Sequence, residues 1–136
     1  MTTPYAPQTV SAPVGGYSHG VEVSPGARLL FISGQIPERP DGTVPEGFEA
    51  QCRAAWANVL AVLAAAEMRP ADLVKVTTFL THADQVDANG RIRREVLGGA
   101  RPALTVMIAQ TLESAWLLEI EAVAAAAPRP TARGER

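Results

Sequence analysis

The fold predicted from this sequence of 136 residues depends most on the stretch Arg101–Ala124, which reads RPALTVMIAQTLESAWLLEIEAVA. It contains two apolar runs, Ala103–Ala109 and Trp116–Ala125, which are separated by a polar turn and predict two strands. In the second run Glu119 and Glu121 both occupy odd positions and therefore share one strand face. We expect Glu119 to face a small-molecule pocket and to position or activate water. The alternative, in which both carboxylates face bulk water or a central polar channel, stays open.

Two further strands are predicted ahead of this stretch. They comprise residues 17–23 and 29–36, and the Ser-Pro-Gly segment 24–26 between them is a turn signal. We therefore expect these strands to form an antiparallel hairpin. Residues 1–12 hold two prolines and no periodicity, which predicts an arm or a first edge strand.

Two helices are predicted between the strands. In residues 48–66 apolar side chains recur at steps of three and four, which indicates an amphipathic helix. Residues 73–81 are rich in β-branched side chains and predict a strand. A second helix is expected over residues 84–97, with Asp84 as its cap and Gly98 at its end.

The element order β-β-α-β-α-β-β predicts an α+β two-layer sandwich, with both helices on one face of a mixed sheet. We expect a single domain over residues 1–126, followed by a disordered Pro- and Arg-rich tail, 127–136. Leu104, Val106 and Ile108 share a strand face and indicate that the second face of the sheet is also apolar. Something must then cover that face, and a symmetric oligomer is the economical answer.

Composition argues against several functions. The chain has 12 basic and 14 acidic residues, so a surface that grips nucleic acid is not expected. The single cysteine, Cys52, lies on the apolar stripe of the first helix and is predicted to be a core residue. His19 and His82 are far apart in the sequence, so we expect no metal site. Because no membrane span or signal peptide is recognisable, a cytoplasmic protein is predicted.

Several polar residues could line a pocket, and each has an ordinary structural alternative. Tyr17 could donate its hydroxyl at a pocket rim or could be an interface tyrosine. Ser33 and Gly34 could bring backbone N–H groups close to a ligand or could form a β-bulge. Asn89 could reach a pocket from the second helix or could be an exposed polar residue. The RIRR segment, 91–94, is expected on a solvated helix face.

Six segments of the chain form a familiar series: GGYSHGVEV, LLFISGQIP, GFEAQCRAAWANVLAVLAAA, DLVKVTTFLT, RPALTV and LLEIEAVA. Together they resemble the RidA/YjgF family, also called the endoribonuclease L-PSP family, from about Tyr17 to Ala124. The most specific parts are SGQIP at 33–37 and EIEAVA at 119–124. The resemblance implies a chorismate-mutase-like fold and a homotrimer that binds a small-molecule ligand in the clefts between subunits. It also implies hydrolysis of reactive enamines and imines, such as 2-aminoacrylate, to a keto acid and ammonia, without metal or cofactor.

The resemblance also assigns roles to individual residues. It implies catalytic roles for Glu119, which would orient the attacking water, and Tyr17, and a substrate pocket that contains Ser33, Gly34 and Asn89. The family motif R-P-A-R-[ST]-x-V includes an arginine that clamps the substrate carboxylate, but this chain reads RPALTV and has Leu104 at that position. Val106 replaces a residue that is often small and polar or a cysteine. Both changes make the pocket more apolar, and Arg101 is expected on the opposite strand face.

The expected function is therefore a RidA-like hydrolytic deaminase whose imine or enamine substrate lacks a carboxylate or holds it differently. A leucine cannot hold a carboxylate, so 2-aminoacrylate is the substrate that Leu104 is least equipped to bind. A non-catalytic trimer that binds a small apolar ligand is the alternative that Leu104 and Val106 favour. Endoribonuclease activity, which the family's older name suggests, is disfavoured by the acidic composition and the lack of stacking aromatic residues.

Overall fold

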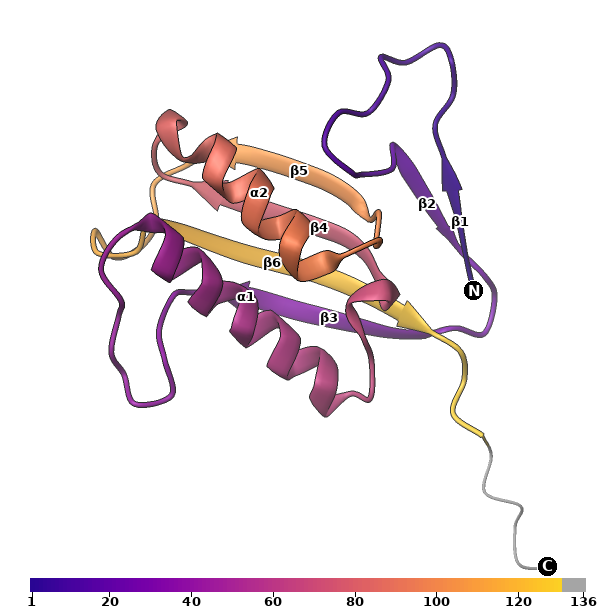
Figure 1. The fold of residues 1–136 in the computed structure, drawn as a ribbon. Coiled ribbons are helices and arrows are strands. Elements are labelled where there is room, and N and C mark those ends of the chain that lie inside the picture. Colours follow the sequence, from indigo (N-terminus) through magenta and orange to yellow (C-terminus); the bar gives the residue numbers. More distant parts are fainter. Residues whose placement is uncertain (131–136) are drawn as a thin grey trace, which may run out of the picture.

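A computed structural model describes residues 1–130 and has the two-layer α+β architecture that the sequence predicts. Four strands form a mixed sheet in the order β3-β6-β4-β5, and both helices cover one of its faces (Figure 1). The strands of this sheet are β3 (Arg28–Gln35), β4 (Leu73–Leu80), β5 (Ala103–Ile108) and β6 (Leu118–Ala126). The helices are α1 (Phe48–Ala65) and α2 (Val86–Leu97), and the 3-10 turns Pro70–Asp72 and Ala83–Gln85 precede β4 and α2.

The strand β6 is central to the sheet because it pairs antiparallel with both β3 and β4. β4 and β5 are parallel, and α2 forms the crossover between them. The stretch 101–124 therefore supplies most of the central strand together with one edge strand. This placement explains why its pattern of apolar and acidic residues is informative about both faces of the sheet.

The predicted hairpin between residues 17–23 and 29–36 is wrong. The strand β2 (Gly20–Val23) pairs instead with β1 (Thr2–Tyr5), and these two form a separate two-stranded sheet (Figure 1). β3 pairs with β6. A turn signal shows where the chain changes direction, but the pairing partner depends on tertiary packing. The N-terminal residues thus form an edge strand, one of the two outcomes predicted for them.

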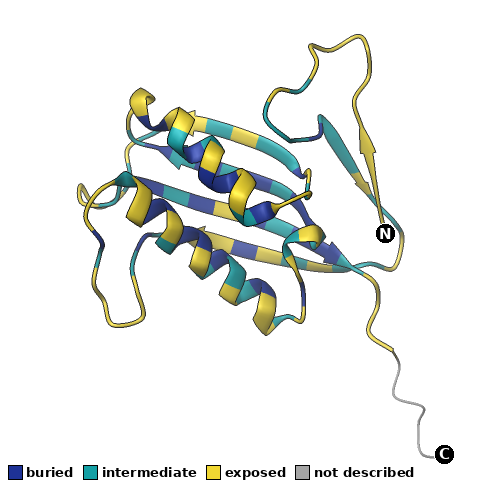
Figure 2. Cartoon of the chain, in the orientation of Figure 1, coloured by how far each residue is buried: buried dark blue, intermediate teal, exposed yellow. Residues whose placement is uncertain are grey.

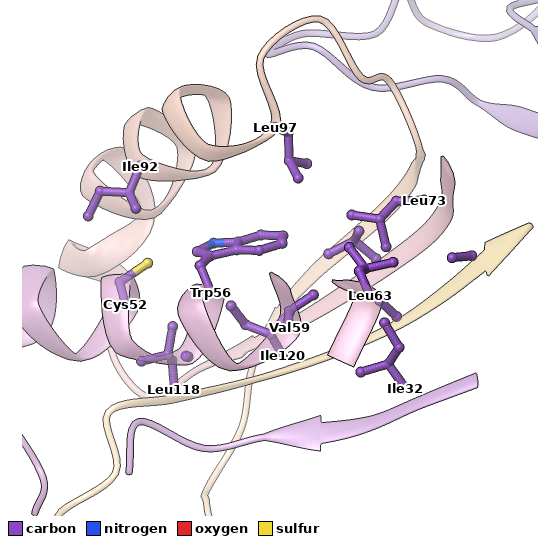
Figure 3. Close-up of a cluster of buried hydrophobic side chains, with 14 of the residues drawn as sticks. Ile32, Cys52, Trp56, Val59, Leu63, Leu73, Ile92, Leu97, Leu118 and Ile120 are labelled. Carbon is purple, nitrogen blue, oxygen red and sulfur yellow. The ribbon is translucent and has the colours of Figure 1, made fainter. Parts of the chain in front are cut away.

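The hydrophobic core lies between the helices and the sheet (Figure 3). Trp56 reaches from α1 into this layer and is fully buried. Leu118 and Ile120 of β6 are also fully buried, whereas Glu119 is half-buried, so the alternation predicted for the last strand is confirmed. Figure 2 shows the same alternation as dark blue bands on the central strands. Each large apolar side chain buried in this way contributes about 1.5–3 kcal/mol.

The apolar stripe that the sequence predicts for α1 consists of Phe48, Cys52, Ala55, Val59, Val62 and Ala66. The buried face of the helix is rotated from this stripe, because it includes Gln51 whereas Val62 is only half-buried. The Gln51 side-chain amide donates to the carbonyl oxygens of Pro45 at 3.0 Å and Ala115 at 2.9 Å. Its Oε1 accepts a hydrogen bond from the backbone N–H of Leu117 at 2.8 Å. These bonds satisfy a buried polar side chain and fasten α1 to the loop before β6.

The side chains of Leu104 and Val106 face the helices, not the open side of the sheet as the sequence analysis predicted. They pair in register with Val76 and Thr78 of β4, both of which are fully buried beneath the helix layer. Ile108, two residues further, follows the same alternation. A strand pattern alone shows which residues share a face, but not which face the helices cover.

No helix within residues 1–130 covers the opposite face of the sheet (Figure 1). Its exposed large apolar residues are Leu29 and Phe31 of β3 and Met107 of β5, which are 54%, 74% and 48% exposed. Such large exposed side chains on one sheet face are typical of an interaction surface. That a partner covers this face stays a prediction, and the residues that motivate it differ from those on which the sequence prediction rested.

No helix within residues 1–130 is long and apolar enough to cross a membrane. β6 ends at Ala126, and residues 127–130 have no regular secondary structure. Residues 131–136 of the predicted disordered tail lie outside the described residues.

Candidate functional site

A groove of about 810 Å³ lies between α2, the edge strand β5 and the segment before β2. Four of the predicted site residues line it: Tyr17, Asn89, Leu104 and Val106. The α2 side of the groove also carries the charged residues Asp87, Arg91, Arg93 and Arg94. The structure therefore brings more than half of the predicted pocket together within one chain.

Tyr17 reaches the groove because its neighbour Ser18 is fastened to the start of β5. The Ser18 N–H donates to the carbonyl oxygen of Pro102 at 3.1 Å, and its hydroxyl donates to that of Arg101 at 2.7 Å. The glycine pair 15–16 precedes Tyr17 with φ angles of 96° and 79°. Because these angles lie in the left-handed region, glycine permits the turn that delivers the tyrosine.

Asn89 projects from α2 and is 1% exposed, so the alternative that it is an exposed polar residue is wrong. Its Oδ1 has no hydrogen-bond partner among the described residues. Leaving a buried polar group unsatisfied costs about 1–3 kcal/mol. The groove thus contains an acceptor that a ligand with an N–H or O–H group could satisfy.

Leu104 and Val106 form the apolar β5 side of the groove. Both are half-buried and pack against the hydrophobic core. β5 therefore contributes no charged side chain at these positions, and any cation for an anionic ligand must come from another element. Arg101 does not supply it, because this residue is exposed and lies outside the groove wall.

Glu119 lies on the open face of the sheet, against the backbone of β3. A register shift between Ile32 and Gln35 shows that β3 contains a β-bulge there, so this interpretation of Ser33 and Gly34 is confirmed. A Cβ atom on residue 34 would lie 2.8 Å from the Glu119 Cδ and 3.1 Å from its Oε1. Only glycine allows the carboxylate to rest at this distance from the strand.

Ser33 is exposed on the same open face. It lines a shallow hollow of about 250 Å³ together with Phe31, Lys75 and Glu121. The Lys75 ammonium donates to the Thr105 hydroxyl at 2.7 Å. This hollow is separate from the groove that contains Tyr17 and Asn89.

The predicted site residues form two groups on opposite sides of the sheet. The first group, which we call the groove half-site, consists of Tyr17, Asn89, Leu104 and Val106. The second group, the carboxylate half-site, consists of Ser33, Gly34 and Glu119. No residue of the carboxylate half-site lines the groove.

Arg93 is a groove residue that was not predicted from the sequence. The expectation that the whole RIRR segment lies on a solvated face is wrong for this residue, because Arg93 is 5% exposed. Arg93 follows Asn89 by four residues, and that spacing puts both on one helix face. This relation was available from the sequence, but it becomes informative only once Asn89 is known to be buried.

Histidine and cysteine contribute no metal site in the described part of the chain. Within residues 1–130, no group of three or more His, Cys, Asp or Glu side chains is placed to hold a metal ion. The His19 ring packs edge-on against Tyr17, with 5.7 Å between the ring centroids. Cys52 is buried in the core, and burial raises the pKa of its thiol to about 12, so it is not a nucleophile.

Comparisons with known proteins agree with the geometry. The family model described as endoribonuclease L-PSP matches residues 8–126. The RutC family protein PH0854 of Pyrococcus horikoshii is 32% identical over 114 residues, which cover 82% of this chain and 88% of that protein. The 2-iminobutanoate/2-iminopropanoate deaminase of Escherichia coli is 36% identical over 81 residues, or 59% of this chain and 61% of that protein. The solved structure of the Rid family protein YyfB from Yersinia pestis has a TM-score of 0.81 and 30% identity, covering 90% of this chain and 97% of that one.

Proposed function

The chain belongs to the endoribonuclease L-PSP family, the RidA/YjgF family that its motifs indicate, and from this premise we propose that it hydrolyses small imines and enamines. The named activity of the E. coli relative is deamination of 2-iminobutanoate and 2-iminopropanoate. In the proposal, this chain carries out the same class of reaction on an imine whose carboxylate is not held by β5.

The observation that carries the proposal is the placement of Glu119. Its half-buried carboxylate is held against Gly34 at the β-bulge, on a sheet face that also carries exposed apolar residues. A carboxylate confined between a strand backbone and an apolar partner surface can orient a water molecule and accept its proton. Glu121, two residues along the same face, is exposed and has no such confinement.

A complete site requires a second copy of the chain. We infer a homotrimer in which the open sheet face of each subunit packs against the neighbouring subunit, so that Leu29, Phe31 and Met107 become buried. In that assembly the carboxylate half-site of one subunit faces the groove half-site of its neighbour. The ligand then lies in the cleft between subunits, in contact with Glu119 from one side and with Tyr17 and Asn89 from the other.

The proposed reaction adds one water molecule to a carbon–nitrogen double bond. The Glu119 carboxylate accepts a proton from water as the new C–O bond forms at the imine carbon, while the Tyr17 hydroxyl donates a hydrogen bond to the bound substrate. The proton then passes to nitrogen and gives a carbinolamine. Its hydroxyl proton moves to the amino nitrogen as the C–N bond breaks, and a carbonyl compound and ammonia leave. An enamine first takes a proton on its terminal carbon to become the imine. Such acid–base assistance accelerates reactions about 10²- to 10⁴-fold.

A non-catalytic binding trimer is the second candidate. The apolar pair Leu104 and Val106 on β5 favours it, because this wall would suit a small apolar ligand and gives no help to a charged one. Both candidates use the same cleft, so they are separated by turnover and not by the location of binding.

The test follows the decay of two reactive compounds with and without the full-length protein. A pyridoxal-phosphate-dependent lyase generates 2-aminoacrylate, and an amino acid oxidase generates 2-iminobutanoate. We expect the protein to accelerate hydrolysis of at least one of them. Glu119→Gln should lower the rate about 100-fold or more, whereas the matched variant Glu121→Gln should retain it.

A wild-type protein that binds a ligand in the cleft without accelerating either reaction would identify the binding trimer. In that case Leu104→Arg supplies the guanidinium that β5 lacks, and a gain of activity would show that the remaining site is competent. Equal losses from Glu119→Gln and Glu121→Gln would contradict the assigned role of Glu119.

A further inference from the structure

Within residues 1–130, Arg93 is a buried cation without a carboxylate to balance its charge. Its side chain is 5% exposed, and it makes one hydrogen bond within residues 1–130, from Nη2 to the Gly15 carbonyl oxygen at 2.8 Å. No carboxylate of the described residues lies within 4.0 Å of it. A guanidinium has five N–H donors, so most of its hydrogen-bonding capacity remains available. Burial, followed by the charge of Arg94, lowers the pKa of Arg93, which reflects the cost of charge at this position.

A second guanidinium lies beside the first. A Cβ atom built on Gly15 would be 3.5 Å from Arg93 Nη2 and 3.5 Å from Arg94 Nη1, so both side chains meet at this glycine. Arg94 also makes no ion pair with a described carboxylate, whereas Arg91 on the same helix pairs with Glu49 and Glu95. Two adjacent cations without an anion repel each other, and an oxyanion bound between them would remove that repulsion.

Asn89 adds an unsatisfied acceptor next to these donors. It precedes Arg93 by one helical turn and lines the same groove, and its buried Oδ1 has no partner among the described residues. The groove therefore offers N–H donors for an oxyanion and, close by, an oxygen for an N–H group. A small molecule with a carboxylate and an adjacent nitrogen, an α-imino acid, satisfies both.

We propose that Arg93, assisted by Arg94, binds the carboxylate of the substrate from α2, while Asn89 accepts a hydrogen bond from the substrate nitrogen. This inference rests on the proposed function for its choice of an α-imino acid. The anionic end of the ligand is held by the helix wall of the groove, and the apolar β5 wall of Leu104 and Val106 contacts its hydrocarbon part. The chain then accepts carboxylate substrates with a leucine at position 104.

Binding is measured without turnover, and the probes are 2-oxobutanoate, which is the stable product of 2-iminobutanoate hydrolysis, and its uncharged methyl ester. Isothermal titration of the full-length protein should show that the acid binds more tightly than the ester. Arg93→Gln should weaken binding of the acid about 30-fold or more and leave binding of the ester almost unchanged. The exposed, ion-paired Arg53 on α1 lies outside the groove, so Arg53→Gln removes an equal charge and should not alter either affinity.

The comparison of acid and ester separates ligand binding from a structural role of Arg93. If Arg93 only fastens the loop at Gly15, Arg93→Gln should weaken both probes equally, and the proposal is overturned. If a carboxylate of a neighbouring subunit pairs with Arg93, the variant should change the oligomer mass in light scattering while the acid-to-ester ratio stays constant, which also overturns it. If Arg93→Gln does not fold, the exposed residue Arg94 provides a second test. An unchanged ratio of acid affinity to ester affinity in the folded Arg94→Gln variant refutes the anion site.

Two further measurements, phosphate binding and imine hydrolysis, test the class of ligand and the proposed function separately. Inorganic phosphate that binds more tightly than 2-oxobutanoate would overturn the carboxylate assignment. A wild type that binds 2-oxobutanoate through Arg93 but never accelerates imine hydrolysis would refute the proposed function and leave the anion site standing. Hydrolysis of 2-iminobutanoate with an unchanged KM in Arg93→Gln would refute the anion site and leave the proposed function standing.

Discussion

The Glu119 carboxylate lies directly against the backbone of Gly34, and a Cβ atom at position 34 would be 2.8 Å from the Glu119 Cδ. Gly34→Ala should therefore displace the carboxylate and lower the rate of imine hydrolysis about 100-fold, because small displacements of catalytic groups have effects of this size. The φ angle of Gly34 is not positive, so the melting temperature should change little. Steady-state rates and thermal melts check both. Gly99→Ala, where an added Cβ meets nothing within 4 Å, is the control, and full activity in Gly34→Ala would contradict the argument.

Phe31 is 74% exposed on the open sheet face and should be a contact residue of the proposed homotrimer. Phe31→Glu would place a charge in that interface without disturbing the core of the chain. We expect light scattering to show monomers and imine hydrolysis to fall with the loss of the trimer. Ala64→Glu, on the exposed side of α1, should leave both properties unchanged. A Phe31→Glu variant that retains the mass of a trimer would exclude this face as the interface.

Asn89→Asp places a carboxylate one helical turn before Arg93 and should form an internal ion pair with it. Because this pair occupies the proposed anion site, binding of 2-oxobutanoate should weaken at least about tenfold, while the melting temperature should rise. Calorimetric titration and thermal melts measure the two effects. Asn89→Leu adds no charge, so it should retain the preference for the acid over the methyl ester. A normal affinity in Asn89→Asp would argue against Arg93 as the anchor.

Gln51 connects α1 to the loop before β6 through three hydrogen bonds to backbone groups. Gln51→Leu should lower the free energy of unfolding by about 2 kcal/mol, because one buried and two partly buried backbone groups would lose their hydrogen-bond partner. Urea denaturation measures this difference. The exposed residue Gln110 provides a control, since Gln110→Leu should change stability by less than about 0.5 kcal/mol.

Cys52 gives the chain a specific alkaline sensitivity. Burial raises the pKa of its thiol to about 12, whereas an unfolded cysteine titrates near pH 8.5. The folded state therefore holds the proton more tightly, so this stabilising contribution is complete below about pH 8.5 and declines as the pH rises towards 12. Unfolding experiments across this range should show a decline that Cys52→Ala lacks. A thiol reagent at pH 8 should modify Cys52 only after denaturation.

Local patterns in the sequence predicted the elements well, because periodicity depends on residues close to one another. Both helices, the strand of residues 73–80 and the alternation around Glu119 agree with the structure. A β-bulge at Ser33 and Gly34 was one of two alternatives that the sequence left open, and the register shift in β3 confirms it. The RidA/YjgF assignment, predicted from motifs along most of the chain, is confirmed by a family model that matches residues 8–126.

The errors concern relationships between distant elements. The partner of β2 depends on how the N-terminal strand folds back, and no local turn signal contains that information. Which face of β5 the helices cover depends on the twist and pairing of the whole sheet, so Leu104 was assigned to the wrong side. Arg93 was overlooked because an arginine in a basic helical segment is usually solvated, and its burial follows only from the packing of α2 against the segment around Gly15.

The two half-sites of one subunit lie on opposite sides of its sheet. In the proposed assembly each cleft therefore combines the Tyr17 of one subunit with the Glu119 of its neighbour. A mixture of two inactive proteins, one with Tyr17→Phe and the other with Glu119→Gln, should then regain activity on reassembly. Some clefts of the hybrid trimers would combine the intact tyrosine of one parent with the intact glutamate of the other. For a cell that carries two damaged copies of the gene, this geometry would let alleles with defects in different half-sites complement each other.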